Sequence, residues 1–299
     1  MMSTYNGGQY IRTQLDSIIN QSIENKSLLI RDDGSTDDTL DIIREYQKVY
    51  PWIILWEGEN IGVQRSFFEL IALADTTADF VAFADQDDQW LPEKLSRAEK
   101  CLEEFPVTVP LLYCSDKLIV GKDLEEINVT VSRVVKKVTF GNALVQNICT
   151  GCTALINRSL LVLLQQHIPT NPDAVIMHDW WLYLVASCFG HVYYDKEAFI
   201  RYRQHGHNTS GAMLNKKVLL KYRIGQLLKP RGELYRQIEE FYNTFIENIN
   251  KKNSVLILKI LKSEHGVVHR FSLALDRRFF RQKISDDLVF RGIVLIGKL

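Results

Sequence analysis

Acidic side chains follow two apolar segments, Leu28–Arg31 and Phe80–Ala84, that we predict to be buried strands. The carboxylates concerned are those of Asp32, Asp33, Asp85, Asp87 and Asp88. Because the carboxyl ends of parallel strands meet at one edge of a sheet, we expect them to converge on one crevice. Like charges crowded there are costly unless a cation or a donor-rich ligand offsets them. Oxygen ligands suit Mg²⁺ or Mn²⁺ better than zinc, so the sequence predicts a divalent metal site.

The alternative is that aspartates in loops only cap helices and shape turns. That interpretation accounts well for Asp37 and Asp38, and we assign Asp32 to a turn or a helix cap rather than to a ligand contact. It accounts less well for the pair Asp85 and Asp87, for which we favour metal ligation.

The elements that must position these carboxylates alternate along the chain. Runs rich in β-branched and aromatic residues predict strands at Leu28–Arg31, Ile53–Trp56, Phe80–Ala84, Leu111–Cys114, Thr153–Ile156 and His191–Tyr194. Apolar residues at helical spacing predict helices at Gln9–Gln21, Asp37–Tyr50, Arg65–Ala74 and Pro92–Phe105. This alternation predicts an α/β fold in which strands are followed by a loop and a helix.

The chain of 299 residues is 46% hydrophobic and 24% charged, which is typical of a globular protein with one large or two smaller domains. Five cysteines are too few, and odd in number, for a disulfide-stapled secreted scaffold, so we expect a reducing compartment. We find neither a charged leader followed by an apolar segment nor the run of ~18 apolar residues that a membrane span needs. These features predict a cytoplasmic protein.

The net charge of zero hides an asymmetry. Residues 1–212 carry 18 Lys and Arg against 28 Asp and Glu, whereas residues 213–299 carry 18 against 8. In the second region basic and apolar residues interleave at helical spacing, a pattern typical of docking on an anionic membrane surface. The alternative is a solvated helix face or an intramolecular match to the acidic region. We do not expect nucleic acid as a partner, because the acidic segments around the site would repel its phosphates.

Motifs between residue 3 and about residue 210 resemble those of the family 2 glycosyltransferases of the GT-A fold, which use nucleotide-sugar donors. They are Ser3-Thr4-Tyr5-Asn6-Gly7, Arg31-Asp32-Asp33-Gly34-Ser35-Thr36-Asp37, Asn60-Ile61-Gly62, Asp85-Gln86-Asp87-Asp88, Asn147 to Cys152, His178-Asp179-Trp180-Trp181, and Tyr202-Arg203-Gln204-His205 through Asn208. The resemblance implies a Rossmann-like, mostly parallel sheet with helices on both faces in a domain of residues 1–212, followed by a basic α-helical region, 213–299. Family members begin with a complete apolar strand. Here only Met1 and Met2 precede Ser3, so we expect the first strand to be largely missing.

The resemblance also implies roles for individual side chains. It assigns donor binding to Ser3, Tyr5, Asp33, Arg65, Asp85 and Gly151. It assigns Asp87 and His205 to a Mn²⁺ or Mg²⁺ ion. Asp179 is implied as the general base, because direct displacement at the anomeric carbon needs one carboxylate to take the proton of the attacking hydroxyl.

Some of these residues have structural alternatives. Tyr5 is also compatible with a core aromatic residue, and Arg65 with a solvated charge on a helix. A lone histidine is more often structural than a ligand, and His207 competes with His205 for the assignment.

Two further pairs have alternatives of the same kind. Trp180 and Trp181 fit either a sugar-stacking wall or a helix core. Cys149 and Cys152 have the spacing of a zinc or redox motif, but without a second close pair we predict packing or pocket lining.

Within the family, the residues of these motifs and the basic tail are most similar to those of bacterial rhamnosyltransferases that build cell-surface polysaccharide. This predicts metal-dependent, inverting transfer of a sugar, L-rhamnose from dTDP-rhamnose or a hexose from a UDP donor, to a hydroxyl of a lipid-linked glycan. We expect the enzyme to lie on the inner face of the plasma membrane through its basic tail. The apolar side chains expected to enter the membrane are Phe279, Phe280, Leu288, Phe290, Ile293 and Leu295.

Two other classes of protein remain open: a non-catalytic nucleotide-sugar-binding or scaffold protein of polysaccharide assembly, and a sugar nucleotidylyltransferase. The absence of a phosphate-binding P-loop, a dinucleotide fingerprint and a nucleophile elbow argues against NTPases, dehydrogenases and α/β-hydrolases.

Overall fold

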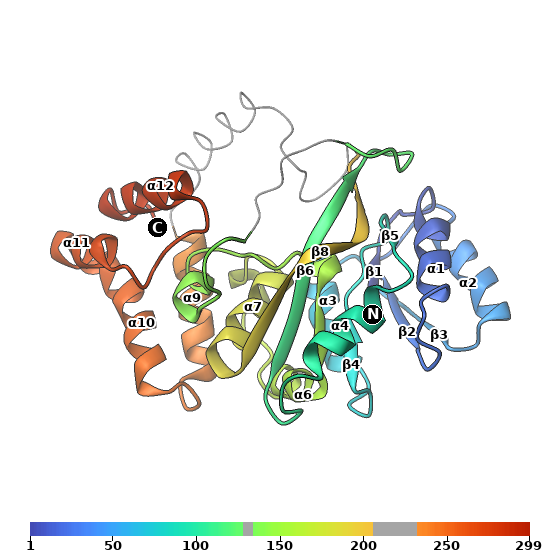
Figure 1. Cartoon of the computed structure of the whole chain (residues 1–299), viewed down its shortest axis with the longest axis horizontal. Coiled ribbons are helices and arrows are strands. Elements are labelled where there is room, and N and C mark those ends of the chain that lie inside the picture. The colour runs from blue at the N-terminus through green and yellow to red at the C-terminus, as the bar shows by residue number, and fades with distance from the viewer. Residues whose placement is uncertain (128–133, 206–231) are drawn as a thin grey trace. The chain divides into compact units, whose positions relative to one another are not determined.

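The computed structural model describes residues 1–127, 134–205 and 232–299 (Figure 1). The chain forms two compact units. Unit 1 comprises Met1–Asn128, Cys149–Ile168 and Gly190–His207, and unit 2 comprises Val129–Ile148, Pro169–Phe189 and Asn208–Leu299. Two segments of the predicted first domain thus group with the C-terminal helices. The predicted boundary at residue 212 lies outside the described residues and stays a prediction.

A parallel sheet of three strands holds the first motifs of unit 1. Its strands are β1 (Met2–Thr4), β2 (Leu28–Asp32) and β3 (Ile53–Glu57), in the order β1-β2-β3. The helices that connect or follow them are α1 (Ile11–Ile19), α2 (Thr39–Val49) and α3 (Val63–Leu73) (Figure 1). The parallel pairing and the strand–loop–helix order confirm the predicted α/β class.

The first strand, which we expected to be largely missing, is short, since β1 has only the three residues Met2–Thr4. Met2 pairs with Ile30, and its side chain is fully buried. On the other side, Met2 forms a parallel bridge with Ala84, whose N–H donates to the Met1 carbonyl at 3.0 Å. The three residues pair with the last three of β2 and place Ser3 and Thr4 beside the loop after β2.

A second sheet of unit 1 contains five strands: β4 (Phe80–Ala82), β5 (Gln89–Trp90), β6 (Leu111–Val120), β7 (Leu155–Asn157) and β8 (His191–Arg203). Their order is β4-β7-β6-β8-β5, and only the pair β6 and β8 is parallel. The expectation of a mostly parallel sheet therefore holds for the first sheet and is wrong for the second. The physical reason is that β4 and β6 run opposite to β7, a direction that apolar runs do not encode.

Helices cover this second sheet. They are α4 (Lys94–Leu102) and α6 (Arg158–Gln166), and a 3₁₀ turn, η1 (Gly151–Thr153), precedes β7. Around Tyr113, α4 buries Ala98, Cys101 and Leu102 against β6 and β7. Strand β6 is longer than predicted and passes through buried Ser115 and Asp116, where its register with β8 shifts. Because these two residues are polar, the sequence pattern did not predict the second half of the strand.

Unit 2 is helical in its described part. Its elements are α5 (Phe140–Ala143), η2 (Pro172–Ala174), α7 (His178–Phe189), α9 (Glu233–Phe245), α10 (Lys251–Lys262), η3 (Ser263–His265), α11 (Val267–Leu275) and α12 (Ile284–Leu295). Its core joins α7 to α9, because the Trp181 ring contacts those of Phe241 and Phe245 at centroid distances of 5.5 and 6.2 Å. The predicted helical C-terminal region is confirmed for residues 233–295. Within the described ranges, none of the helices has the length and apolar character of a bilayer span.

Candidate active site

The end of β8 is tied to the acidic loop of residues 85–88. Nε2 of His205 lies 2.7 Å from Oδ2 of Asp87. The Arg203 side chain donates from Nε to the Asp87 carbonyl at 2.6 Å, and the Arg203 backbone N–H donates to Oδ1 of Asp88 at 3.0 Å. Residues two apart in extended backbone project to the same side, which explains the Arg-x-His spacing. The structure therefore brings together Asp87 and His205, the two predicted metal ligands.

Tyr10, just before α1, completes this arrangement. Its ring stacks on the His205 imidazole with centroids 4.8 Å apart and interplanar angle 26°. The guanidinium carbon of Arg203 lies 4.7 Å from the same ring centroid. The tyrosine thus contacts both residues that hold the acidic loop, a position favourable for cation–π attraction. No motif in the sequence pointed to Tyr10, since the contact joins segments almost 200 residues apart.

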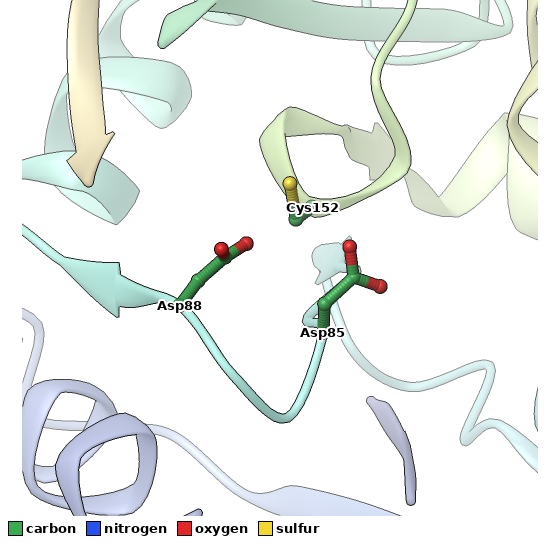
Figure 2. A group of neighbouring side chains, drawn as sticks. All are labelled: Asp85, Asp88 and Cys152. Carbon is green, nitrogen blue, oxygen red and sulfur yellow. The ribbon is translucent and has the colours of Figure 1, made fainter. Parts of the chain in front are cut away.

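A second group of possible ligand atoms lies at the base of the same loop. Asp85, Asp88 and Cys152 each offer an atom within 4.8 Å of the others, and Figure 2 shows the three side chains around one space. Burial, then the carboxylates of Asp85 and Asp87, raises the pKa of Asp88 well above its usual range. Burial, then Asp88 and Asp85, likewise raises the pKa of the Cys152 thiol. Both groups are therefore favoured in their neutral forms.

A buried lysine supplies positive charge at this base. Lys94, at the start of α4, is 2% exposed, and its Nζ lies 3.7 Å from the centroid of the Trp90 ring. Burial lowers its pKa to about 8, against the opposing effect of Cys152, Asp88 and Asp85. Lys94 is thus a counter-charge to the acidic loop, and no motif in the sequence pointed to it.

The two groups of side chains differ in how well their ligand atoms suit a divalent cation. Asp87 and His205 are a carboxylate and an imidazole on the half-buried side of the loop, and both fit Mn²⁺, with carboxylate oxygen also fitting Mg²⁺. The group with Cys152 contains a thiol, a soft ligand that these ions do not prefer. The residues present therefore fit the predicted ion at Asp87 and His205, with Asp85 beside them.

Asp32 and Asp33 have different surroundings at the end of β2. Asp32 accepts from the backbone N–H of Ser35 at 2.8 Å and from the hydroxyls of Ser35 and Thr4 at 2.6 and 2.9 Å. It is a turn-forming acid, as predicted. Asp33 accepts from Arg31 at 2.5 Å and from the backbone N–H groups of Ile61 and Gly62, each at 2.9 Å. Its carboxylate links β2 to the Asn60-Ile61-Gly62 loop.

The other predicted donor-binding residues of the first motifs lie at the same end of the first sheet. The Tyr5 side chain is 48% exposed, which contradicts the alternative that it is a core aromatic residue. Its backbone N–H and carbonyl both bond to the Gln86 side chain, at 2.8 and 2.9 Å. Ser3 Oγ lies 2.7 Å from Ser66 Oγ, and Arg65 is exposed in the first turn of α3.

Gly151 begins η1 and lies buried between Thr150 and Cys152. The Thr150 hydroxyl accepts from Lys117 Nζ at 3.0 Å, and this ammonium lies 3.9 Å from the ring centroid of Tyr202 on β8. The loop that we predicted to line a sugar pocket is thus tied to β6 by a lysine that the sequence analysis missed. Cys149 and Cys152 are both buried and form no disulfide, in line with the packing that we predicted.

Asp179 belongs to unit 2, where it is the second residue of α7. Its side chain is 9% exposed, and Oδ1 accepts from Asn147 Nδ2 at 2.9 Å. The first turn of a helix favours the ionised carboxylate. Trp181 is fully buried in the helical core, which supports the core alternative for this residue, while the half-buried Trp180 donates to the Ala143 carbonyl at 2.7 Å.

Not every predicted residue can be placed. His207 and Asn208 lie outside the described residues. Asp179 lies in a different unit from Asp87 and His205, so its role as the base stays a prediction.

Comparison with known proteins shows the family and the fold. The family profile described as Glycosyl transferase family 2 matches residues 1–162. The chain is 32% identical over 310 residues to the dTDP-rhamnosyl transferase RfbG of Shigella flexneri, and the alignment covers 99% of each protein. Among solved structures it is similar to S. aureus TarS 1–349 in complex with UDP-GlcNAc, with TM-score 0.59, 16% identity and coverage of 99% of this chain and 89% of that one.

A second solved structure is more distant. The mannosyltransferase PcManGT from Pyrobaculum calidifontis, in complex with GDP-Man and Mn²⁺, matches with TM-score 0.51 and 15% identity, covering 91% of this chain and 70% of that one. At these identities the two structures show that the fold is shared.

Proposed function

The chain belongs to glycosyl transferase family 2, and from this membership we propose that it is a metal-dependent, inverting enzyme that transfers L-rhamnose from dTDP-rhamnose to a hydroxyl of a lipid-linked surface glycan. The observation that carries the proposal is the pair Asp87 and His205, held side by side by Arg203 and Tyr10. The near full-length likeness to a dTDP-rhamnosyl transferase supports the donor, and a UDP-hexose is the alternative.

We propose that Ser3, Tyr5 and Asp33 bind the nucleotide base. The exposed ring of Tyr5 is available for stacking. A carboxylate has about four acceptor positions, and three hydrogen bonds to Asp33 leave one on Oδ2. That position suits the imide N–H that thymine and uracil share, so Asp33 would select for pyrimidine donors without separating the two.

We assign the binding of the diphosphate and of the sugar to neighbouring side chains. A divalent ion held by Asp87 and His205 would act as a Lewis acid on the leaving diphosphate. We assign Asp85, whose carboxylate lies within 4.8 Å of ligand atoms of Asp88 and Cys152, to the ribose. Exposed Arg65 supplies a cation for the diphosphate, and the loop at Gly151, braced by Lys117, lines the sugar pocket.

The base in the proposed reaction is Asp179. Its carboxylate takes the proton of the acceptor hydroxyl as that oxygen bonds to the anomeric carbon. The bond from this carbon to the diphosphate oxygen breaks at the same time, and the electron pair leaves on the diphosphate. Attack opposite to the leaving group inverts the anomeric configuration. Asn147 donates its amide N–H to this carboxylate and so helps to hold it in position.

A nucleotide-release assay tests this function. The full chain is incubated with Mn²⁺ or Mg²⁺, with dTDP- or UDP-sugars and with lipid-linked or water-soluble acceptors. We expect acceptor-dependent release that is lost in Asp179→Asn and retained in Asp173→Asn, a matched change of an exposed aspartate in the same unit. Donor binding without release under any of these conditions would support a non-catalytic scaffold. Formation of pyrophosphate when the chain is instead given a nucleoside triphosphate and a sugar 1-phosphate would support a nucleotidylyltransferase.

The proposed acceptor also bears on location. Because a lipid-linked glycan is presented at a membrane, we propose that the enzyme works on the cytoplasmic face of the plasma membrane and is held there by its basic C-terminal region. Two of the side chains that we expected to enter the membrane cannot do so. Phe279 and Phe290 are fully buried in unit 2, so the prediction is wrong for these two residues.

A further inference from the structure

Helices α11 and α12 form a hairpin at the C-terminal end of unit 2 (Figure 1). Their shared interior contains Leu273, Phe290 and Val294, each 1% exposed or less. The Arg291 side chain fixes the pair, because it donates to the carbonyls of Ala274 and Phe279 and pairs with Asp287 at 3.0 Å. The hairpin is therefore a defined surface, not a fluctuating tail.

The outward sides of both helices are unusually apolar. The exposed side chains are Val268, Phe271 and Leu275 on α11, and Ile284, Leu288 and Ile296 on or next to α12. Their exposures run from 53% to 79%. The first three follow one another at i, i+3 and i+7, so they share one helix face. Each helix thus exposes a row of apolar side chains, and exposed apolar surface of this kind marks interaction sites.

Basic residues adjoin the apolar side chains. Arg277 and Lys283 are exposed and follow or precede Leu275 and Ile284 closely, and neither is paired with a described carboxylate. In contrast, Arg278 pairs with Asp276. Residues 262–299 together hold eight Lys and Arg against four Asp and Glu. The acids of the hairpin thus compensate only part of its positive charge.

We propose that the exposed side of the α11–α12 hairpin docks on an anionic lipid bilayer, with Phe271, Leu275 and Leu288 entering the interface and Arg277 and Lys283 meeting the headgroups. The inference rests on the proposed function, because it places the enzyme where a lipid-linked acceptor is found. Helices of 9 and 12 residues are too short to span the hydrocarbon core, so they lie in the plane of the interface.

A second copy of the chain fits this surface less well. The cores of protein interfaces are depleted in unpaired charge. In a symmetric pairing, the same patch meets itself, so the uncompensated Arg277 and Lys283 of one copy would approach the positive patch of the other. Anionic lipid offers both the opposite charge and an apolar phase.

Co-sedimentation of the full chain with vesicles tests the proposal. The vesicles contain phosphatidylcholine alone or with about a third phosphatidylglycerol. We expect binding to the anionic vesicles that weakens in high salt. The double variant Phe271→Ser, Leu288→Ser should reduce the partition coefficient at least tenfold. The matched control is Ile246→Ser, Val255→Ser, whose side chains are also about half exposed in unit 2, and it should bind like the wild type.

A second pair of variants separates charge from apolar insertion. Arg277→Gln, Lys283→Gln should weaken binding to anionic vesicles and reduce its salt dependence. Wild-type binding by both double variants, with circular dichroism showing that each is folded, would overturn the proposal. So would concentration-dependent self-association that Phe271→Ser, Leu288→Ser removes while vesicle binding persists.

The outcome is separable from that of the proposed function. Nucleotide release with a water-soluble acceptor does not require the membrane, so it should be unchanged in the hairpin variants. If the vesicle-binding predictions fail while turnover of a water-soluble acceptor is intact, the docking surface alone is refuted. Vesicle binding as predicted, without turnover on any donor, would refute the proposed reaction and leave the docking surface standing.

Discussion

Nε2 of His205, just beyond β8, lies 2.7 Å from Oδ2 of Asp87, and the two residues are 118 positions apart in the chain. Three further contacts hold this pair: the bond from Arg203 to the Asp87 carbonyl, the bond from the Arg203 N–H to Asp88, and the stack of Tyr10 on the imidazole. These contacts hold both side chains at the acidic loop. A metal site needs such support, because ligands that other residues hold in place bind the ion at a lower cost.

The first prediction concerns the ligands themselves. Asp87→Asn removes the charge of one ligand, and His205→Ala removes the other ligand. We expect each change to weaken Mn²⁺ binding by at least tenfold, measured as free Mn²⁺ by electron paramagnetic resonance. Asp37→Asn, which changes a loop acid bonded to Thr39, is the control. Unchanged affinity in Asp87→Asn and His205→Ala would place the ion elsewhere, and the group of Asp85, Asp88 and Cys152 would then be the next candidate.

The second prediction concerns Tyr10 as a positioning residue. If its ring orients the imidazole, Tyr10→Leu should weaken Mn²⁺ affinity by about 10-fold or more, the range found for groups that orient metal ligands. Tyr10→Phe keeps the ring and should retain nearly wild-type affinity. The same two variants should differ in the environment of the His205 ring protons, followed by nuclear magnetic resonance. Equal affinity in both variants would show that the stack only fills space.

These residues also show what the sequence could and could not predict. The acidic loop was predicted from residue type and from its place after a predicted strand, and the Arg-x-His segment was identified by its resemblance to a family motif. Tyr10 and Lys94 were missed because their roles depend on contacts with segments distant in the chain. Neither a lone tyrosine nor a lone lysine carries a signal until the fold shows which group it touches.

The basic tail shows that the packing of apolar side chains is also hard to predict from the sequence. An amphipathic pattern predicts that a helix has one apolar face, but not which apolar residues an adjoining segment will cover. Phe279 and Phe290 became core residues, while Phe271 and Leu275 remained exposed. The second sheet deviated for a related reason, since apolar runs give the position of a strand but not its direction.

The third prediction concerns the proposed base. Asn147 donates to Asp179 and so helps to hold its carboxylate in position. Asn147→Ala should therefore lower kcat at neutral pH by about tenfold, because the proposed base loses this contact. The KM for the donor should stay within twofold. A rise in KM with an unchanged kcat would assign Asn147 to substrate binding instead of to the base.

The fourth prediction concerns the stability of the hairpin that we propose to dock on lipid. Asp276 joins α10 to the segment after α11, pairing with Lys259 at 2.7 Å and with Arg278 at 2.6 Å. The bond from Arg278, then that from Lys259, lowers the pKa of Asp276 despite partial burial. A carboxyl whose pKa is lower in the folded state stabilises the fold above its unfolded pKa of about 3.9, and this contribution is lost as the pH falls below that value.

Asp276→Asn should accordingly lower the free energy of unfolding by about 1 to 2 kcal/mol at pH 7, because the side chain is largely buried but its partner Arg278 is half exposed. The difference from the wild type should shrink towards zero as the pH is lowered through about 4 to 2. Urea unfolding across this range measures it. Asp41→Asn is the control, since Asp41 pairs with Arg44 only at 3.6 Å on an exposed face and should contribute little at any pH. A deficit in Asp276→Asn that persists undiminished at pH 2 would show that the contribution is not that of the charge.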